Sequence, residues 1–262
     1  MSQARSKKVL AASTCGSDGA NQRIPKVIGV AEIAVSDHRS SQLSFEELSR
    51  IAAEARVGGM IGGKAGLVHL HMGSGRRRLD PIIRIVQETE IPIRQFLPTH
   101  LTRTQSLLEQ SIQFARMGGN IDFTVKGREL SFPLTTDKAL EMALGGGVAI
   151  EQITLSSDSN GSMPVFDDKG NLIRLAAGDI QNLYLDWKGL VEGGLPMEDA
   201  LRMVTSNPAR RAGIYEHKGS IEEGKDADLL ILRADLAIEM VIAKGRVMID
   251  QGEVLVKGTF EE

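Results

Sequence analysis

The chain of 262 residues is 42% hydrophobic and 25% charged, and its formal net charge at pH 7 is −3. No apolar run approaches the roughly 18 residues that span a bilayer, and the near-neutral charge gives no electrostatic footprint for nucleic acid. The length suits one (β/α)8 barrel or two smaller domains, and it excludes a disulfide miniprotein and a repeat array. With Cys15 as its single cysteine, the chain is expected in a reducing compartment, the cytoplasm.

Residues 1–24 come before the first regular pattern. This stretch is rich in Ser, Ala, Gly and basic residues and holds one acidic residue, Asp18. We interpret it as a poorly ordered lead-in. An organelle transit peptide would have a similar composition, but the stretch has no clean amphipathic face.

From Pro25 onward, short β-branched runs alternate with helical patterns, as is typical of βα units around a parallel sheet. A capping box at Ser44-Phe-Glu-Glu47 begins the first predicted helix, and Asp80-Pro81 is the predicted N-cap and first turn of the second. Further helical patterns cover 104–119 and 136–144. The predicted strands are 27–36, 67–72, 95–100, 121–125 and 152–157.

The pattern changes after Asp158. Residues 159–170 are predicted to form a loop, followed by an amphipathic stretch at 180–190 and a helix at 197–205. Four short strand patterns then follow, at 227–232, 238–242, 247–249 and 254–256. We therefore expect three parts: the lead-in at 1–24, a partial (β/α) barrel with the metal site at 25–210, and a small C-terminal β subdomain segment at 211–262.

Metal-binding side chains fall within or at the ends of the predicted strands. Glu32 lies in the first strand, His71 ends the second, His100 ends the third, and Asp158 follows the last. Because the carboxyl ends of parallel barrel strands converge on one face, these four side chains should meet there. Taken singly, each histidine could be structural and Asp158 could be a turn residue. Together they favour a hydrolytic divalent metal such as zinc with an open position for water.

The other histidines receive simpler interpretations. His69 shares one face of a strand with His71, so the pair could hold a metal by itself. We favour a position one layer deeper, where His69 hydrogen-bonds within the barrel. His38 and His217 are expected to face solvent.

Two further patterns need to be weighed. Residues 58–65 match the spacing of a phosphate-binding loop, but Ala65 replaces the required Ser or Thr and a helical pattern precedes it, so nucleotide binding is rejected. Arg76, Arg77 and Arg78 could attract an anionic substrate or form a solvated loop.

Several segments resemble the isoaspartyl dipeptidase family of the amidohydrolase superfamily. The most specific are Ser36-Asp-His-Arg39 and Ser156-Ser-Asp-Ser-Asn-Gly-Ser162, and the closing stretch Thr205-Ser-Asn-Pro-Ala-Arg210 is similar to a motif of the whole superfamily. The resemblance covers about residues 25–261. It rests also on residues 27–40, 66–73, 96–100, 219–228 and 256–260.

The resemblance implies a (β/α)8 barrel that uses two zinc ions to hydrolyse β-aspartyl dipeptides. It makes His71 and His100 ligands of the second metal, and it makes Asp158 both a ligand of the first metal and the proton-shuttling base. Glu32 stands where the family usually has a carbamylated lysine that bridges the two metals, and its carboxylate offers the same two-oxygen head.

The resemblance also assigns substrate contacts. Arg39 and Arg103 match arginines that bind substrate carboxylates, for which a guanidinium fork is geometrically suited. Ser162 matches a substrate-contacting serine.

The sequence departs from the family before Val27. There the family has the His-x-His of the first metal, an amine-binding glutamate and a carbonyl-polarising tyrosine, whereas this chain has its polar lead-in. Tyr184 and Tyr215 lie elsewhere, and His69 with His71 cannot substitute, because His71 aligns with a second-metal ligand. We therefore expect about strands 4–8 of a barrel and one or two zinc ions.

The resulting expectation is a zinc-dependent β-aspartyl dipeptidase of weak turnover, a metalloprotease-type hydrolase that is a homo-oligomer and acts on a small dipeptide. One alternative is a non-catalytic remnant or fragment with exposed sheet edges, which binds at most a metal or a partner. A second alternative keeps the fold but hydrolyses a cyclic amide or an N-acyl amino acid.

Overall fold

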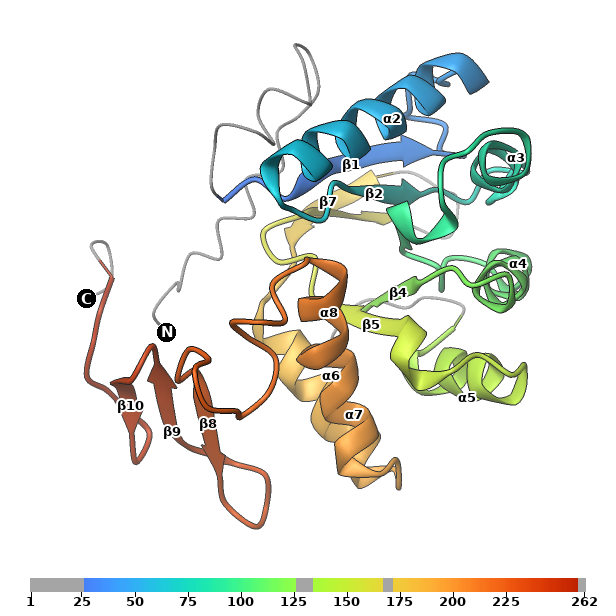
Figure 1. Ribbon diagram of the computed structural model, residues 1–262. Helices are drawn as coiled ribbons and strands as arrows, with labels where there is room; N and C mark the ends of the chain where they lie inside the picture. The colour runs from blue at the N-terminus through green and yellow to red at the C-terminus, as the bar shows by residue number, and fades with distance from the viewer. Residues whose placement is uncertain (1–25, 126–133, 167–171, 259–262) are drawn as a thin grey trace.

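A computed structural model describes residues 26–125, 134–166 and 172–258, so the predicted lead-in lies outside the described residues. Five parallel strands form its centre (Figure 1). β1, β2 and β3 pair in that order, β4 pairs with β5, and β3 lies in contact with β4. The five predicted strands are thus confirmed, β2 with the predicted bounds and the other four with slightly narrower ones. They are β1 (Gly29–Val35), β2 (Leu67–Met72), β3 (Phe96–Thr99), β4 (Ile121–Thr124) and β5 (Ile153–Ser156).

Helices connect the successive strands and lie on the outer side of the strand series in Figure 1. The predicted capping box is present, because Ser44 Oγ accepts from the Glu47 N–H and the Glu47 carboxylate accepts from the Ser44 N–H. Thr104 caps the third connecting helix by accepting from the Leu107 N–H. These helices are α2 (Phe45–Gly62), α3 (Asp80–Glu88), α4 (Gln105–Arg116) and α5 (Thr136–Gly145), and single turns at Ile93–Gln95 (η1) and Ile150–Gln152 (η2) precede β3 and β5.

The start of α3 differs from the prediction by one residue. Leu79 occupies the N-cap position, and Asp80 is the first helical residue. The carboxylate of Asp80 accepts instead from the side-chain amide of Gln110, 2.5 Å away on α4. The acid therefore joins two helices rather than capping its own.

The segment after β5 contains a hairpin where a loop was predicted for 159–170. β6 (Ser162–Phe166) and β7 (Leu172–Ala177) pair antiparallel, so the loop prediction is wrong for the residues of β6. The expected helices follow as α6 (Gln181–Glu192) and α7 (Met197–Val204). A short helix that was not predicted, α8 (Ser206–Arg211), packs on β5 through buried Asn207, whose amide donates to the backbone oxygens of Ile150 and Ile153 at 2.8 Å each.

A second sheet occupies the C-terminal end of the described chain. Its four strands are antiparallel in the order β11-β10-β9-β8, and they confirm the four short strand patterns. Tyr184 and Lys188 of α6 donate to the backbone oxygens of Leu236 and Asp235, which joins α6 to the turn between two of these strands. The strands are β8 (Leu229–Leu232), β9 (Ile238–Ala243), β10 (Arg246–Asp250) and β11 (Glu253–Val254).

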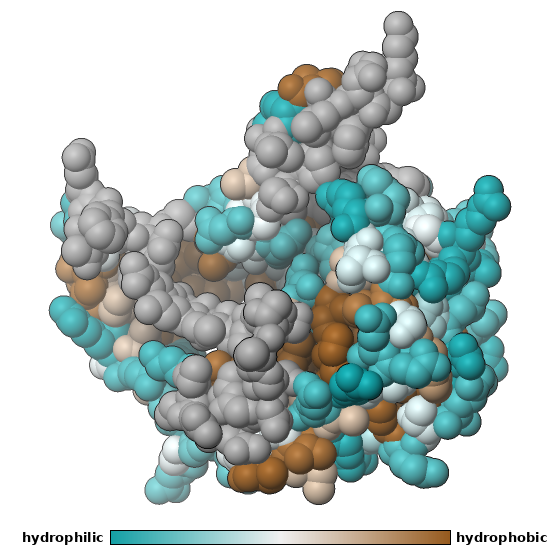
Figure 2. All heavy atoms as spheres, turned by 90° about the horizontal axis from the view of Figure 1, so that it is seen from above, coloured by the Kyte–Doolittle hydropathy of each residue, from teal (hydrophilic) through white to brown (hydrophobic). Residues whose placement is uncertain are grey.

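The two faces of the parallel strands differ in polarity, and this difference places the site. In β2, Leu70 and Met72 are fully buried in the hydrophobic core with the helices, whereas the alternating residues His69 and His71 point to the other face and are partly exposed. The face of the molecule seen in Figure 2 is mostly hydrophilic, with hydrophobic side chains in its hollowed parts. Among the described helices, none is both long enough and apolar enough to cross a membrane.

The core makes a stability prediction. Leu107 of α4 is fully buried, so Leu107→Ala should lower the free energy of unfolding by about 2–5 kcal/mol through lost burial and a residual cavity. Leu185 of α6 is 53% exposed, so Leu185→Ala is the matched control and should change stability by less than about 0.5 kcal/mol. Urea denaturation measures both values, and equal losses in the two variants would contradict this description of the core.

Candidate metal centre

Glu32 owes its position to an irregularity in β1. Val30 pairs with Val68 and Ile33 pairs with Leu70, so one extra residue is accommodated on β1 between these two pairs. Such bulges bend a strand and redirect its side chains. Glu32 lies in this stretch, and its carboxylate reaches the face of the sheet that carries His71.

The carboxyl ends of three strands carry residues in the left-handed backbone region. Ser36 after β1, His100 after β3 and Asp158 after β5 have φ values of 55°, 62° and 46°. This region is uncommon for residues other than glycine, and its cost is often found at functional sites. The three turns bring the side chains that follow the strands to one edge of the sheet.

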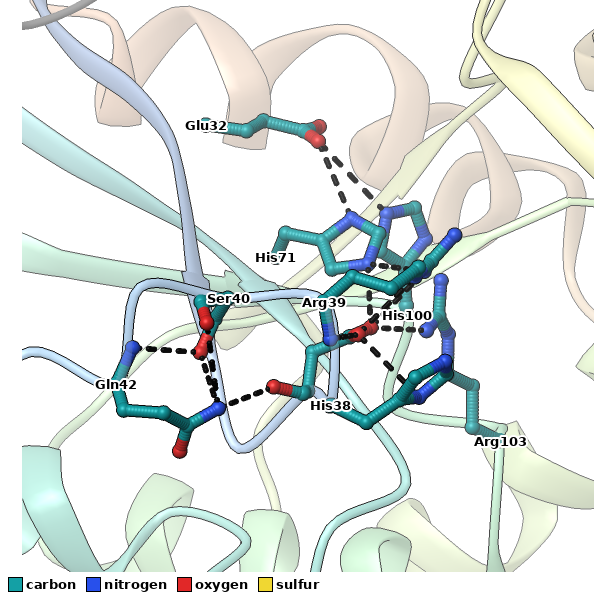
Figure 3. A network of polar contacts seen from close by, with 9 residues as sticks. Glu32, His38, Arg39, Ser40, Gln42, His71, His100 and Arg103 are labelled. Atoms are coloured by element: carbon teal, nitrogen blue, oxygen red, sulfur yellow. Dashed lines mark hydrogen bonds and ion pairs between the residues drawn. The ribbon is translucent and has the colours of Figure 1, made fainter.

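Glu32, His71 and His100 meet at this edge (Figure 3). Glu32 Oε2 lies 3.4 Å from His71 Nδ1 and 3.9 Å from His100 Nε2, and one ligand atom from each of the three residues lies within 4.8 Å of the others. The two imidazoles are edge-on, with ring centroids 4.4 Å apart. His100 and then His71 hold the pKa of Glu32 well below its usual range, so Glu32 is an anion at neutral pH.

The donor set of this cluster fits a divalent metal ion. One carboxylate and two imidazoles are oxygen and nitrogen ligands of the kind found in hydrolytic metal sites. His100 Nε2 is buried and makes no hydrogen bond within the described part of the chain, although such an atom normally has a partner. The cluster could therefore hold a metal ion, and three of the four ligands predicted from the sequence lie together.

Asp158, the fourth predicted ligand, is outside this three-residue cluster but within its electrostatic reach. Burial raises the pKa of Asp158, while the charges of His100, His71 and Arg103 oppose that shift. A Cβ atom at residue 161 would lie 2.2 Å from Asp158 Oδ1, so the turn needs Gly161 to let the carboxylate approach the backbone.

Asp37 is a site residue that sequence reasoning missed. Its side chain is 3% exposed and binds Arg39 through two contacts, from Nε to Oδ1 at 3.0 Å and from Nη2 to Oδ2 at 2.9 Å. Arg103 Nη1 donates to Asp37 Oδ2 at 3.3 Å, and His71 Nε2 lies 3.3 Å from the same oxygen. The position of Asp37 directly after a strand end is the signal that could have found it, because the same rule selected Asp158.

This arrangement brings the two predicted substrate-binding arginines together. Arg39 holds the pKa of Asp37 well below its usual range, and burial lowers the pKa of Arg103. One carboxylate thus faces two guanidinium groups, which leaves positive charge for an anionic ligand. Ser162, the third predicted substrate contact, begins β6, and its side chain lies outside the described residues.

The remaining histidines were predicted with mixed success. His38, with 83% of its side chain exposed, and His217 face solvent as expected. His69 borders the cluster, because its Nδ1 atom lies 3.7 Å from Glu32 Oε1. The bend at Glu32 brings the carboxylate between the two histidines of β2, and so His69 is nearer to the site than expected.

The fold agrees with the rejection of the phosphate-binding loop and places Arg76 and Arg77 of the arginine run at the surface. Residues 58–62 belong to the last turns of α2, so a helix and not a strand precedes Lys64. Arg76 and Arg77 are exposed, and Arg77 donates to the side-chain oxygen of Gln42.

Comparison with known proteins gives the family. Residues 22–248 match the Amidohydrolase family. The chain belongs to this family. Its fold is accordingly the α/β fold of the metal-dependent amidohydrolases, whose members include (β/α)8-barrel hydrolases.

Two solved structures of the β-aspartyl dipeptidase from Fervidobacterium islandicum AW-1 are similar to the chain. The structure in complex with the β-Asp-Leu dipeptide is 41% identical with a TM-score of 0.87, and the alignment covers 95% of this chain and 65% of that one. The second structure is 37% identical with a TM-score of 0.83 and coverages of 95% and 63%. The dihydropyrimidinase of Arabidopsis thaliana is 30% identical over 128 residues, 45% of this chain and 24% of that protein. The chain thus spans less than two thirds of each of these proteins.

The cluster predicts that metal binding depends on two histidines. His71→Ala and His100→Ala should each weaken zinc binding by at least about tenfold, because the loss of an outer partner alone costs that much. Competition with a chromogenic chelator measures the affinity. His217→Ala, which removes an exposed histidine from a distant segment, is the control and should bind zinc like the unaltered chain. Equal affinity in all three variants would place the metal elsewhere.

Proposed function

We propose that this chain is a zinc-dependent hydrolase that cleaves the isopeptide bond of β-aspartyl dipeptides. The observation that carries the proposal is the Glu32, His71 and His100 cluster beside two arginines that share the buried Asp37. A metal site next to a pair of guanidinium groups suits a substrate that has both a scissile amide and free carboxylates. Similarity to the Fervidobacterium β-aspartyl dipeptidase supports this substrate class.

In this proposal Glu32, His71 and His100 hold zinc, and Asp158 is a further ligand. Zinc, when bound, supplies a Lewis acid that lowers the pKa of water and polarises a carbonyl. Without metal, the carboxylates of Glu32, Asp37 and Asp158 outnumber the guanidinium groups of Arg39 and Arg103 by one. A divalent cation reverses the sign of this local charge and makes the site attractive to an anionic substrate.

Asp158 is the proposed general base. Burial raises its pKa from the usual value, which makes its carboxylate a better proton acceptor. The carboxylate takes a proton from the attacking water and returns it to the nitrogen of the leaving group, so that the C–N bond breaks with release of a neutral amine and not of an amide anion.

Arg39 and Arg103 bind the carboxylates of the substrate. A β-aspartyl dipeptide keeps the free α-carboxylate of its aspartyl residue and the carboxylate of its second residue. Asp37 fixes both guanidinium groups at one place, since it bonds each of them, and thereby prepares the site before substrate arrives. Ser162 is proposed as an additional polar contact to substrate.

We also propose a domain organisation for the chain. The five parallel strands correspond to about strands 4–8 of a (β/α)8 barrel within residues 25–210, and residues 211–262 form a small C-terminal β subdomain segment. We further propose a cytoplasmic homo-oligomer, for which light scattering after size exclusion is the test.

Substrate class is tested directly. The zinc-loaded chain should release leucine and aspartate from β-Asp-Leu and leave α-Asp-Leu intact, because in the β-linked form the ammonium group and the free carboxylate are on the same carbon, whereas in the α-linked form they are on different carbons. Amino-acid chromatography measures the products. Dihydrouracil and an N-acyl amino acid are tested as alternative substrates. Faster hydrolysis of either one would favour an amidohydrolase that acts on a cyclic amide or an N-acyl amino acid. Zinc binding without hydrolysis of any of these substrates would contradict the proposal that the chain is a hydrolase.

The role of Arg103 predicts a change in substrate binding. Arg103→Met should raise KM for β-Asp-Leu by about 10–100-fold, because a charge-assisted contact contributes about 1.5–3 kcal/mol. Arg76→Met is the matched control, since Arg76 is an exposed loop arginine a few residues after His71. Steady-state kinetics give both values. A larger increase in KM for Arg76→Met than for Arg103→Met would indicate that the arginine run at 76–78, and not Arg103, binds the substrate.

A further inference from the structure

Asp122 is a buried carboxylate that the proposed reaction does not use. It lies in β4, and its residue exposure is 3%. Thr99 Oγ1 and Ser156 Oγ donate to its Oδ2 atom at 2.6 and 2.5 Å, and Thr154 Oγ1 donates to its Oδ1 atom at 2.5 Å. The carboxylate therefore joins β3, β4 and β5 through three hydroxyl groups.

A chain of hydrogen bonds leads from this carboxylate to His100. Thr99 Oγ1 lies 2.9 Å from Thr124 Oγ1, which in turn lies 2.8 Å from His100 Nδ1, and both contacts are buried. The other ring nitrogen, Nε2, is the buried atom that faces Glu32. The chain thus ends on the nitrogen that points away from the candidate metal centre.

The direction of each bond in the chain follows from the number of hydrogens available. An ionised carboxylate only accepts, and a threonine hydroxyl has one hydrogen to donate. Thr99 gives its hydrogen to Asp122, so it must accept from Thr124. Thr124 has then used its own hydrogen and must accept from His100. In the neutral imidazole this chain places the proton on Nδ1 and the lone pair on Nε2, which at 3.9 Å from Glu32 Oε2 makes no hydrogen bond to that carboxylate.

We propose that Asp122 is a positioning residue that fixes the tautomer of His100 through Thr99 and Thr124, so that Nε2 is ready to bind the metal. The inference rests on the proposed role of His100 as a ligand. Partners behind a metal-binding histidine commonly set its tautomer and ring orientation. Here the partner is a carboxylate that acts through two hydroxyls.

His71 has an acceptor near each of its ring nitrogens, and Glu32 Oε2 lies 3.4 Å from its Nδ1 atom. Its Nε2 atom lies 3.3 Å from Asp37 Oδ2, an acceptor, and 3.4 Å from Arg39 Nη2, a donor. These neighbours favour opposite tautomers. The hydroxyl chain therefore gives His100 a fixed protonation pattern that the surroundings of His71 do not impose.

Two isosteric variants separate this role from a merely structural one. Thr99→Val removes the hydroxyl that takes the hydrogen of Thr124, so Thr124 is free to donate to Nδ1 and the proton moves to Nε2. Thr154→Val is the matched control, because it removes a hydroxyl from the same buried carboxylate but not from the path to His100. Thermal melts check that both variants fold.

The tautomer is read from the ¹⁵N chemical shifts of His100 in metal-free protein at about pH 9, where an ordinary imidazole is neutral. The signals are assigned with His100→Gln. The unaltered chain and Thr154→Val should carry the proton on Nδ1, whereas Thr99→Val should carry a substantial fraction on Nε2. Zinc affinity should fall about tenfold in Thr99→Val relative to Thr154→Val.

Wild-type tautomer and affinity in Thr99→Val would overturn the proposal, and so would equal changes in both variants. If Thr99→Val does not fold, Thr124→Ser and Thr124→Val decide, because serine keeps the hydroxyl and valine removes it. Serine should then retain the Nδ1 proton and valine should lose the preference, and identical spectra would overturn the proposal. Absence of zinc binding in the unaltered chain would count against the proposed function, while the metal-free tautomer would still decide this inference.

Discussion

The placement of one carboxylate against two imidazoles is the constraint on which the site depends. Glu32 is an anion whose pKa is held low by His100 and His71, and its Oε2 atom faces a ring nitrogen of each. Three groups rich in lone pairs repel one another unless protons or a cation lie between them. The surrounding polar contacts must therefore hold each ring in place: Asp37 contacts His71, and Asp122 is linked to His100 through Thr99 and Thr124.

The sheet explains why these groups meet. Parallel strands bring their carboxyl ends to one edge, and the backbone after three of them turns through the left-handed region. A bulge in β1 adds Glu32 to this edge from within the strand. The apolar side chains that alternate with the histidines of β2 pack against the helices, so the same strand that stabilises the core also presents His69 and His71.

Much of this could be predicted from local patterns. β-Branched runs gave the five strands, and strand-end placement selected His71, His100 and Asp158. The hairpin β6 and β7 could not be predicted in the same way, because Pro164 and the polar residues around 167–171 are typical of a loop. α8 was missed because Pro208 usually interrupts a helix, whereas here it lies in the first turn, where its missing N–H costs little.

Asp37 and Asp122 were not predicted as site residues, for a different physical reason. A carboxylate in or after a strand has many possible partners, and the actual ones come from strands and turns far away in the chain. The hydroxyl partners of Asp122 on β5 depend on the register of β4 with β5, which sets Thr154 opposite Asp122 and Ser156 opposite Thr124. Sequence patterns locate such a residue but do not say which hydroxyls it orients.

The desolvation of the two buried carboxylates, Asp37 and Asp122, is offset by different kinds of partner. Asp37 is compensated by guanidinium groups, which also serve the proposed binding of substrate, so its environment changes when an anion arrives. Asp122 is compensated by the dipoles of three hydroxyl groups, each with a single hydrogen. Asp37 lies 3.3 Å from His71 Nε2, whereas Asp122 is linked to His100 Nδ1 only through Thr99 and Thr124. The two carboxylates therefore act on their histidines in different ways, one by direct contact and the other through hydroxyl groups whose single hydrogens fix the direction of each bond.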